Sequence, residues 1–121
     1  MEKSPDFFID SIRSKGELAG VYEWDGDAAY FYLYGINKDA GKKILNSLHI
    51  YSGKPIFNDE DIVMKWDNKE EKVGLYILGE LWAVFDVAEG RKYGGNYSLN
   101  RSPDIPKEIL EEFLPKRSHP K

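Results

Sequence analysis

Apolar and polar residues alternate along much of the chain, and this alternation predicts β-strands. Asp25-Gly26-Asp27 separates the runs LAGVYEW and AAYFYLYGI, an arrangement typical of a β-hairpin. A meander of three more strands is expected at residues 62–66, 73–78 and 81–87. Gly79-Glu80 lies between the last two and predicts a second tight hairpin.

Three other segments show signals of amphipathic helices. The first runs from Ser4 to Gly16, with Pro5 as the first helical residue. The second begins at Asp39, and the third opens at Asp104 and ends before Pro115. The second helix would have its apolar stripe at i, i+4, i+5 and i+8, which are Ala40, Ile44, Leu45 and Leu48.

These elements predict an α+β fold, with a single mostly antiparallel sheet of about five strands and two or three covering helices. A chain of 121 residues without an internal repeat is expected to form a single domain, residues 1–115. Residues 116–121 contain no apolar side chain and are expected to form a flexible tail.

The alternation also divides the strand residues between two faces of the sheet. One face is aliphatic, and Phe31, Leu75, Ile77 and Phe85 are expected in the main core. The other face is aromatic and amphipathic, made of Tyr22, Trp24, Tyr30, Tyr32, Tyr34, Tyr76 and Trp82. The simpler interpretation is an ordinary half-wet sheet face, since Tyr and Trp favour strands. The alternative is a surface for a protein partner or a homodimer that includes Trp24, Tyr32 and Trp82.

The stretch EGRKYGGNYSLN, residues 89–100, raises the question of anion binding. Residues 90–102 contain three basic residues and no acidic one. Neither Walker nor dinucleotide-loop spacing is present, so a turn is the first interpretation. The second is a small-anion site, in which the backbone N–H groups of Gly94, Gly95 and Asn96 form a nest beside Arg91 and Lys92.

The composition narrows the chemistry further. The absence of cysteine excludes disulfides, thiolate metal sites and a cysteine nucleophile. The acidic clusters EWDGD and NDED lack the spacing of a calcium loop, so no metal site is predicted. No cofactor is expected.

A net charge of −4 argues against non-specific nucleic-acid binding. The N-terminus lacks an apolar signal region and no stretch could span a bilayer, so a cytoplasmic protein without membrane contact is expected.

Catalytic candidates are few. His49 is the only histidine before the tail, and no G-x-S-x-G elbow supplies a nucleophile. A pair of carboxylates could be assembled in space from Glu23, Asp25 or Asp86, but their spacing in the sequence does not support it.

The runs GVYEWDGDAAYFYLY, ILNSLHIY and VGLYILGELWAVFDV, in that order, resemble a family of short bacterial proteins classified as a domain of unknown function, number 2251 in its series. The resemblance extends over roughly residues 20–87. It implies a bacterial source and a small α+β fold. It implies no activity, catalytic residue or cofactor.

Taken together, these features predict a small binding or interaction module, of which an antitoxin-like immunity protein is one version. The alternative hypothesis is an enzyme acting on a small ligand, with His49, Asp86 or Glu23 as acid or base. An exposed aromatic patch would favour the first hypothesis, and a deep pocket around one of these ionisable groups would favour the second.

Overall fold

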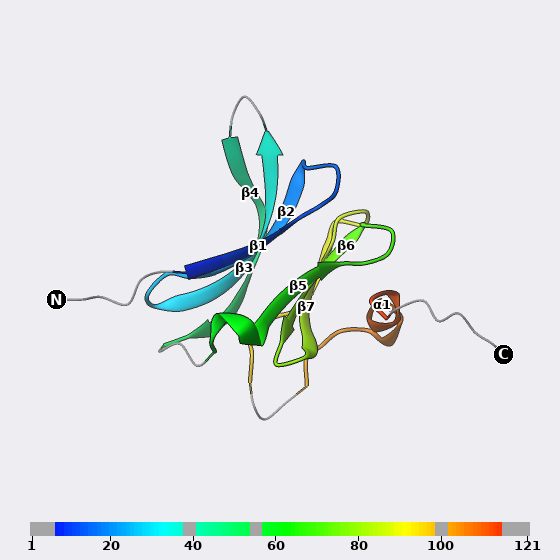
Figure 1. Cartoon of the computed structure of the whole chain (residues 1–121). Helices are drawn as coiled ribbons and strands as arrows, with labels where there is room; N and C mark the ends of the chain where they lie inside the picture. The colour runs from blue at the N-terminus through cyan, green and yellow to red at the C-terminus, as the bar shows by residue number, and fades with distance from the viewer. Residues whose placement is uncertain (1–6, 38–40, 54–56, 99–101, 115–121) are drawn as a thin grey trace.

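The chain folds into two four-stranded antiparallel sheets (Figure 1). The computed structural model describes residues 7–37, 41–53, 57–98 and 102–114. In both sheets the spatial order of the strands follows the sequence. The first sheet comprises β1 (Phe7–Ile12), β2 (Leu18–Trp24), β3 (Ala28–Asn37) and β4 (Gly41–Ser52). The second comprises β5 (Ile62–Trp66), β6 (Lys72–Ile77), β7 (Glu80–Asp86) and β8 (Arg91–Gly94). A 3-10 turn, η1 (Asp59–Asp61), precedes β5, and α1 (Lys107–Glu112) follows β8.

The predicted α+β class is therefore wrong, because the described chain is mostly β and has two sheets instead of one. Two expected helices are strands. The segment from Ser4 to Gly16 contains β1, which pairs with β2 residue by residue. The segment expected to be helical from Asp39 contains β4, which pairs with β3 along its whole length. In both cases long-range pairing overrides a local helical spacing. The two predicted hairpins, the three strands of the meander and the last helix are confirmed, although that helix is shorter than expected.

The main core lies between the two sheets. The predicted core residues Phe31, Leu75, Ile77 and Phe85 are all buried, and the rings of Phe31 and Phe85 are 4.6 Å apart between centroids. At Gly20 the sheets approach so closely that an added Cβ would lie 2.7 Å from Val73 Cγ2. The two sheets therefore share one continuous apolar interior.

A β-bulge in β7 changes which residues face this core. Leu75 pairs with Ala83 but Tyr76 pairs with Leu81, so Trp82 is an extra residue in the ladder. Trp82 and Ala83 consequently both join the main core. Strict alternation predicts Trp82 on the opposite face, and that placement is wrong.

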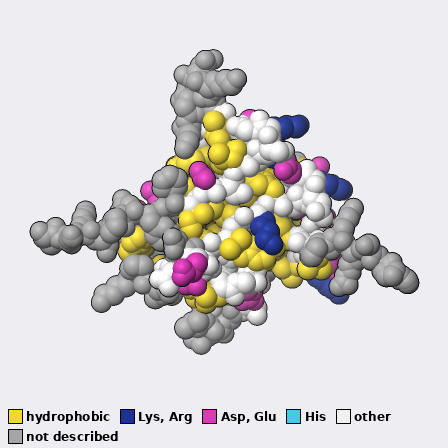
Figure 2. All heavy atoms as spheres, viewed as in Figure 1, with side chains coloured by type: hydrophobic (Ala, Val, Ile, Leu, Met, Phe, Trp, Pro, Cys, Tyr) yellow, Lys and Arg dark blue, Asp and Glu magenta, His cyan; other side chains and the backbone are white. Residues whose placement is uncertain are grey.

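The sheets are also joined along both sides. On one side Trp66 Nε1 of β5 donates to the Ser11 carbonyl of β1, at 3.0 Å. Hydrophobic side chains gather in the middle of the face seen in Figure 2, where β1 and β5 lie. On the other side the segment after β8 reaches β4, because Asn96 N–H donates to His49 O and Tyr97 N–H to Ile50 O.

Helix α1 lies against the outer face of the second sheet, away from the first sheet (Figure 1). Ile109 packs on Leu81 and Val84 in a small second core. An ion pair of 2.8 Å between Lys72 Nζ and Glu112 Oε1 holds the helix to β6. Within the described ranges this is the only α-helix, so the first sheet has no helical cover among those residues.

Candidate functional site: the outer face of the first sheet

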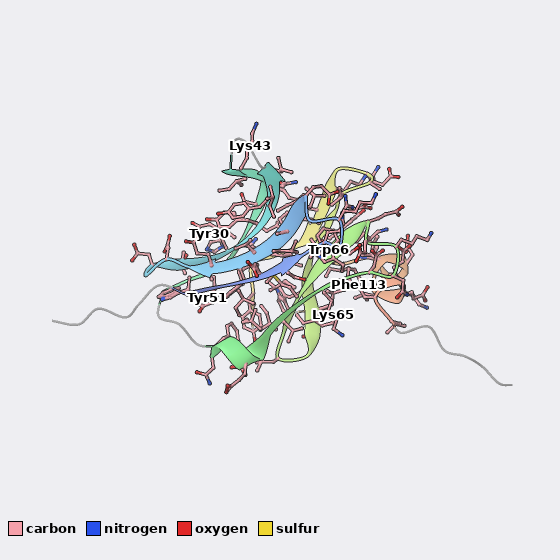
Figure 3. All side chains as sticks on the ribbon, turned by 45° about the horizontal axis from the view of Figure 1, so that its top comes forward. Tyr30, Lys43, Tyr51, Lys65, Trp66 and Phe113 are labelled. Atoms are coloured by element: carbon pink, nitrogen blue, oxygen red, sulfur yellow. The ribbon has the colours of Figure 1, made fainter. Side chains whose placement is uncertain are left out.

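Three tyrosines of β3 form a row on the outer face of the first sheet. Tyr30, Tyr32 and Tyr34 alternate along the strand, so they project from the same side. Tyr30 and Tyr32 stack with 5.9 Å between ring centroids, and Tyr32 and Tyr34 with 5.7 Å. All three are partly exposed. In Figure 3, Tyr30 lies on the side of the sheet that faces away from the second sheet, whereas Tyr51 lies between the sheets.

Strand pairing extends this row into an apolar surface. Ile12, Ala19, Tyr34 and Ile44 are successive partners across all four strands, and paired residues share a face. Ile12 is 54% exposed and Ile44 is 50% exposed. Two large aliphatic side chains therefore remain in solvent at the two ends of this crossing row.

The next crossing rows are more polar. Asp10, Val21, Tyr32 and Ser47 are paired partners in one row, and Glu23 pairs with Tyr30 in the other. Burial raises the pKa of Tyr32, and the nearby negative charges of Glu23 and Asp25 raise it further. The surface thus combines an apolar end with an acidic end.

His49 continues the face beyond Tyr30, its partner on β3. The two rings meet edge to face, with 5.6 Å between centroids. His49 Nε2 lies 2.9 Å from Ser52 Oγ, and His49 Nδ1 lies 2.9 Å from Asn96 Oδ1. The imidazole is therefore held between a hydroxyl and an amide oxygen.

A bulge in β4 brings His49 and Ser52 to the same side. Tyr30 pairs with His49 but Ala29 pairs with Tyr51, which leaves Ile50 as the extra residue. Residues three apart in a regular strand point to opposite faces. Because of the bulge, Ile50 and Tyr51 both turn into the core, while His49 and Ser52 meet outside.

The glycine-rich stretch delivers Asn96 to this site. Gly94, Gly95 and Asn96 have φ values of 81°, 96° and 48°, so three successive residues adopt left-handed backbone conformations. Gly95 N–H donates to Trp82 O and Asn96 N–H donates to His49 O. Two of the amides expected in an anion nest are thus engaged within the protein.

Arg91 and Lys92 are exposed, and Lys92 Nζ donates to Ser47 O. Anion binding at residues 90–102 stays a prediction, and the described backbone there serves as a sheet-to-sheet connection.

The predicted aromatic face is divided by the structure. Tyr30, Tyr32 and Tyr34 share one face as expected. Tyr22, Trp24 and Trp82 are instead buried in the core, with exposures of 0%, 4% and 2%. Tyr76 is on the outer face of the second sheet, next to α1. Trp24 and Trp82 therefore offer no accessible surface to a partner, and their expected placement is corrected.

The candidate carboxylates are not brought together as a pair. Glu23 belongs to the tyrosine face, and Asp25 accepts hydrogen bonds from the N–H groups of Asp27 and Ala28, which hold the pKa of its carboxyl below the ordinary value. Asp86 is buried in the second sheet, with Oδ2 3.9 Å from Lys72 Nζ. The sequence predicts His49 as a candidate and Asn96 only as a backbone amide of an anion nest, and it does not point to Ser52, Ile12 or Ile44. A bulge and a sheet crossing bring these residues into place, and neither has a clear sequence signal.

A family comparison agrees with the predicted resemblance. The model of a family described as "uncharacterized protein conserved in bacteria (DUF2251)" matches residues 2–109. The chain belongs to DUF2251. No curated protein and no solved structure matches this DUF2251 chain.

This DUF2251 chain also has a pocket of about 480 Å³ between the second sheet and α1. Its walls include Tyr76, Leu81, Ile105, Leu110 and Leu114. It is distant in the fold from His49, since it lies on the outer face of the other sheet.

Within the described residues, no three His, Cys, Asp or Glu side chains gather as a metal site would require. No helix in the described ranges is both long and apolar enough to cross a bilayer.

Proposed function

We propose that this protein is a binding module that docks a protein partner on the outer face of its first sheet. The observation that carries the proposal is a difference between the outer faces of the two sheets. The outer face of the second sheet is covered by α1 and has its own small core. The outer face of the first sheet has a tyrosine row along β3, and Tyr34 of that row lies between exposed Ile12 and Ile44. Contiguous exposed apolar residues with tyrosines are typical of protein interfaces.

The tyrosine geometry favours a protein over a sugar or a nucleic-acid base. Sugars and bases are bound by aromatic rings whose faces are free. Here Tyr32 lies between two rings nearly parallel to it, with interplanar angles of 17° and 3°, so it has a neighbouring ring on both sides. The surface also offers ring edges, hydroxyl groups and the aliphatic side chains of Ile12 and Ile44, which suit an apolar protein surface with hydrogen-bonding groups.

Charge indicates the character of the partner. Asp10 and Glu23 belong to this face, and the chain carries a net charge of −4. A partner with an apolar centre and basic residues opposite Asp10 and Glu23 would be complementary. An acidic immunity protein that masks a basic toxin would be one module of this kind.

The test places a photo-crosslinking amino acid at Tyr34, in living bacteria that contain the partner. The matched control carries it at Val63, which is 44% exposed on the outer face of the second sheet. We expect a specific adduct from position 34 and none from position 63. The purified partner should then bind the wild-type chain and lose about thirtyfold in affinity with Tyr32→Ala, as expected of a hot spot worth about 2 kcal/mol. Val63→Ala should leave affinity unchanged, and both variants should keep the wild-type melting curve.

Two results would contradict the proposal. One is a position-34 adduct with a second copy of this chain, which would make the face a homodimer interface. The other is unchanged affinity for the purified partner in a folded Tyr32→Ala variant.

A further inference from the structure

We propose that Ser52 is an activated nucleophile, with His49 as its general base, and that it forms covalent acyl adducts with small activated esters. Ser52 Oγ lies 2.9 Å from His49 Nε2, within the range for proton transfer from a hydroxyl to an imidazole. Ser52 is exposed, so a small ester can reach it from solvent. The inference does not rest on a protein partner, since the reacting group and its base both belong to this chain.

Asn96 is the positioning residue for His49. Its Oδ1 lies 2.9 Å from His49 Nδ1 and can only accept a hydrogen bond. The neutral imidazole therefore carries its proton on Nδ1 and directs the lone pair of Nε2 toward Ser52 Oγ. A serine, a histidine and a third oriented group have these roles in hydrolase triads on unrelated folds.

The surrounding fold fixes the imidazole in this orientation. Asn96 is tied to His49 twice, by the side-chain contact and by the hydrogen bond from Asn96 N–H to His49 O. The ring of Tyr30, which is labelled in Figure 3, borders the imidazole edge to face. The β4 bulge sets the position of Ser52 relative to His49. A merely solvated surface histidine would need none of these contacts.

The reaction follows from the positions of the proton and the lone pairs. Ser52 Oγ attacks the carbonyl carbon of the ester while its proton passes to His49 Nε2. The bond from the carbonyl carbon to the leaving oxygen then breaks, and His49 returns the proton to that oxygen. The products are an acyl-serine and an alcohol or phenol. Water can release the acid by the same steps with the roles of water and Ser52 exchanged.

The geometry predicts a slow reaction. Gly53 N–H, the amide directly after the nucleophile, donates to Asp27 O and is not free to stabilise an oxyanion. Phenyl esters and fluorophosphonates, which carry good leaving groups, are therefore the suitable probes. The Tyr30 ring beside His49 gives an aromatic leaving group an apolar neighbour.

The experiment treats the full-length protein with a serine-selective fluorophosphonate and follows labelling of each serine by peptide mass spectrometry. Ser47 is an exposed serine of the same strand and serves as the internal control. We expect Ser52 to be labelled much faster than Ser47. His49→Gln should slow labelling of Ser52 about a hundredfold, the usual contribution of a general base. Asn96→Ala should also slow it, and Asn96→Asp, which keeps an acceptor oxygen, should restore part of the rate.

The wild-type protein alone already tests the proposal. Labelling of Ser52 no faster than that of Ser47 would overturn it, whatever the stability of the variants. Labelling of Ser52 that is unchanged in His49→Gln, with the wild-type melting curve retained, would overturn it as well. A p-nitrophenyl acetate assay provides the second measurement, with release of p-nitrophenol and one acetyl group on Ser52 as the expected result.

Discussion

At Gly94 the surrounding backbone leaves the least room for a side chain. An added Cβ there would lie 2.0 Å from the carbonyl oxygen of Trp82, a distance that no side chain tolerates. With φ at 81°, the residue also occupies a region that side chains disfavour. Gly94 begins the left-handed turn that carries the chain from β8 to β4 and ends at Asn96. One glycine thereby sets both the connection between the sheets and the position of an amide oxygen beside His49.

Gly94→Ala should therefore destabilise the fold strongly. We expect a loss of about 3 kcal/mol or more in the free energy of unfolding, because overpacking adds to backbone strain. Gly90→Ala is the matched control, since Gly90 also has a positive φ, of 69°, but an added Cβ meets nothing within 4 Å. Its cost should be about 1 kcal/mol, from the backbone alone. Urea unfolding of the two variants measures the difference, and equal losses would show that the contact with Trp82 is easily relieved.

At the scale of elements, β3 and β4 show what the sequence could and could not reveal. The tyrosines of β3 alternate strictly, so their common face was predictable from the pattern alone. In β4, Ile44, Leu45 and Leu48 have the spacing of a helical stripe, but the strand contains two bulges. A bulge inserts one residue and reverses the alternation, which makes a strand resemble a helix over a few positions. The same effect in β7 put Trp82 into the core against the prediction. His49 was identifiable as the one histidine before the tail, but its partner Asn96 lies 47 residues away.

Helix α1 was predictable from the sequence because Ile109 and Phe113 have helical spacing. The stability of its attachment to the second sheet should depend on pH. The hydrogen bond from Lys72 holds the pKa of the Glu112 carboxyl below its ordinary value of 4.5. A lowered pKa in the folded state means that the pair stabilises the protein above pH 4.5, and that this contribution is lost as the pH falls through the folded-state pKa. Glu112 has 42% of its side chain exposed, so the contribution should stay below about 1 kcal/mol.

The measurement compares urea unfolding of wild type and Glu112→Gln at neutral and acidic pH. Wild type should be slightly more stable at neutral pH, and the difference should shrink as the pH falls below 4.5 and the carboxyl becomes protonated. Glu111→Gln, at an exposed position on the same helix, is the control and should change little at either pH. A difference that persists in acid would mean that Glu112 stabilises α1 by packing and not by charge.

At the scale of the whole molecule, the two sheets depend on one interior. Tyr22, Phe31 and Ile50 of the first sheet belong to the same buried cluster as Leu75 and Phe85 of the second. Hydrogen bonds join the sheets at β1 with β5 and at β4 with the segment after β8. Hairpin signals in the sequence pair neighbouring strands, but nothing in the strand patterns indicates where one sheet ends and the next begins, so the sequence predicts a single sheet. Once the sheets face each other, only their outer faces remain for helices or partners, and α1 covers one of them.

A shared interior implies that the two sheets unfold together, and Leu75→Ala tests this. Leu75 belongs to β6 and is fully buried, so the substitution should cost about 2–5 kcal/mol. Native-state hydrogen exchange should then show the most protected amides of β2 and β3 exchanging faster by the same factor as those of β6 and β7, since all of them open through global unfolding. Val63→Ala, at an exposed position on the neighbouring strand β5, should leave both sets nearly unchanged. If the amides of β2 and β3 kept their wild-type exchange rates in Leu75→Ala, the first sheet would be stable without the second, and the tyrosine face would belong to an independent folding unit.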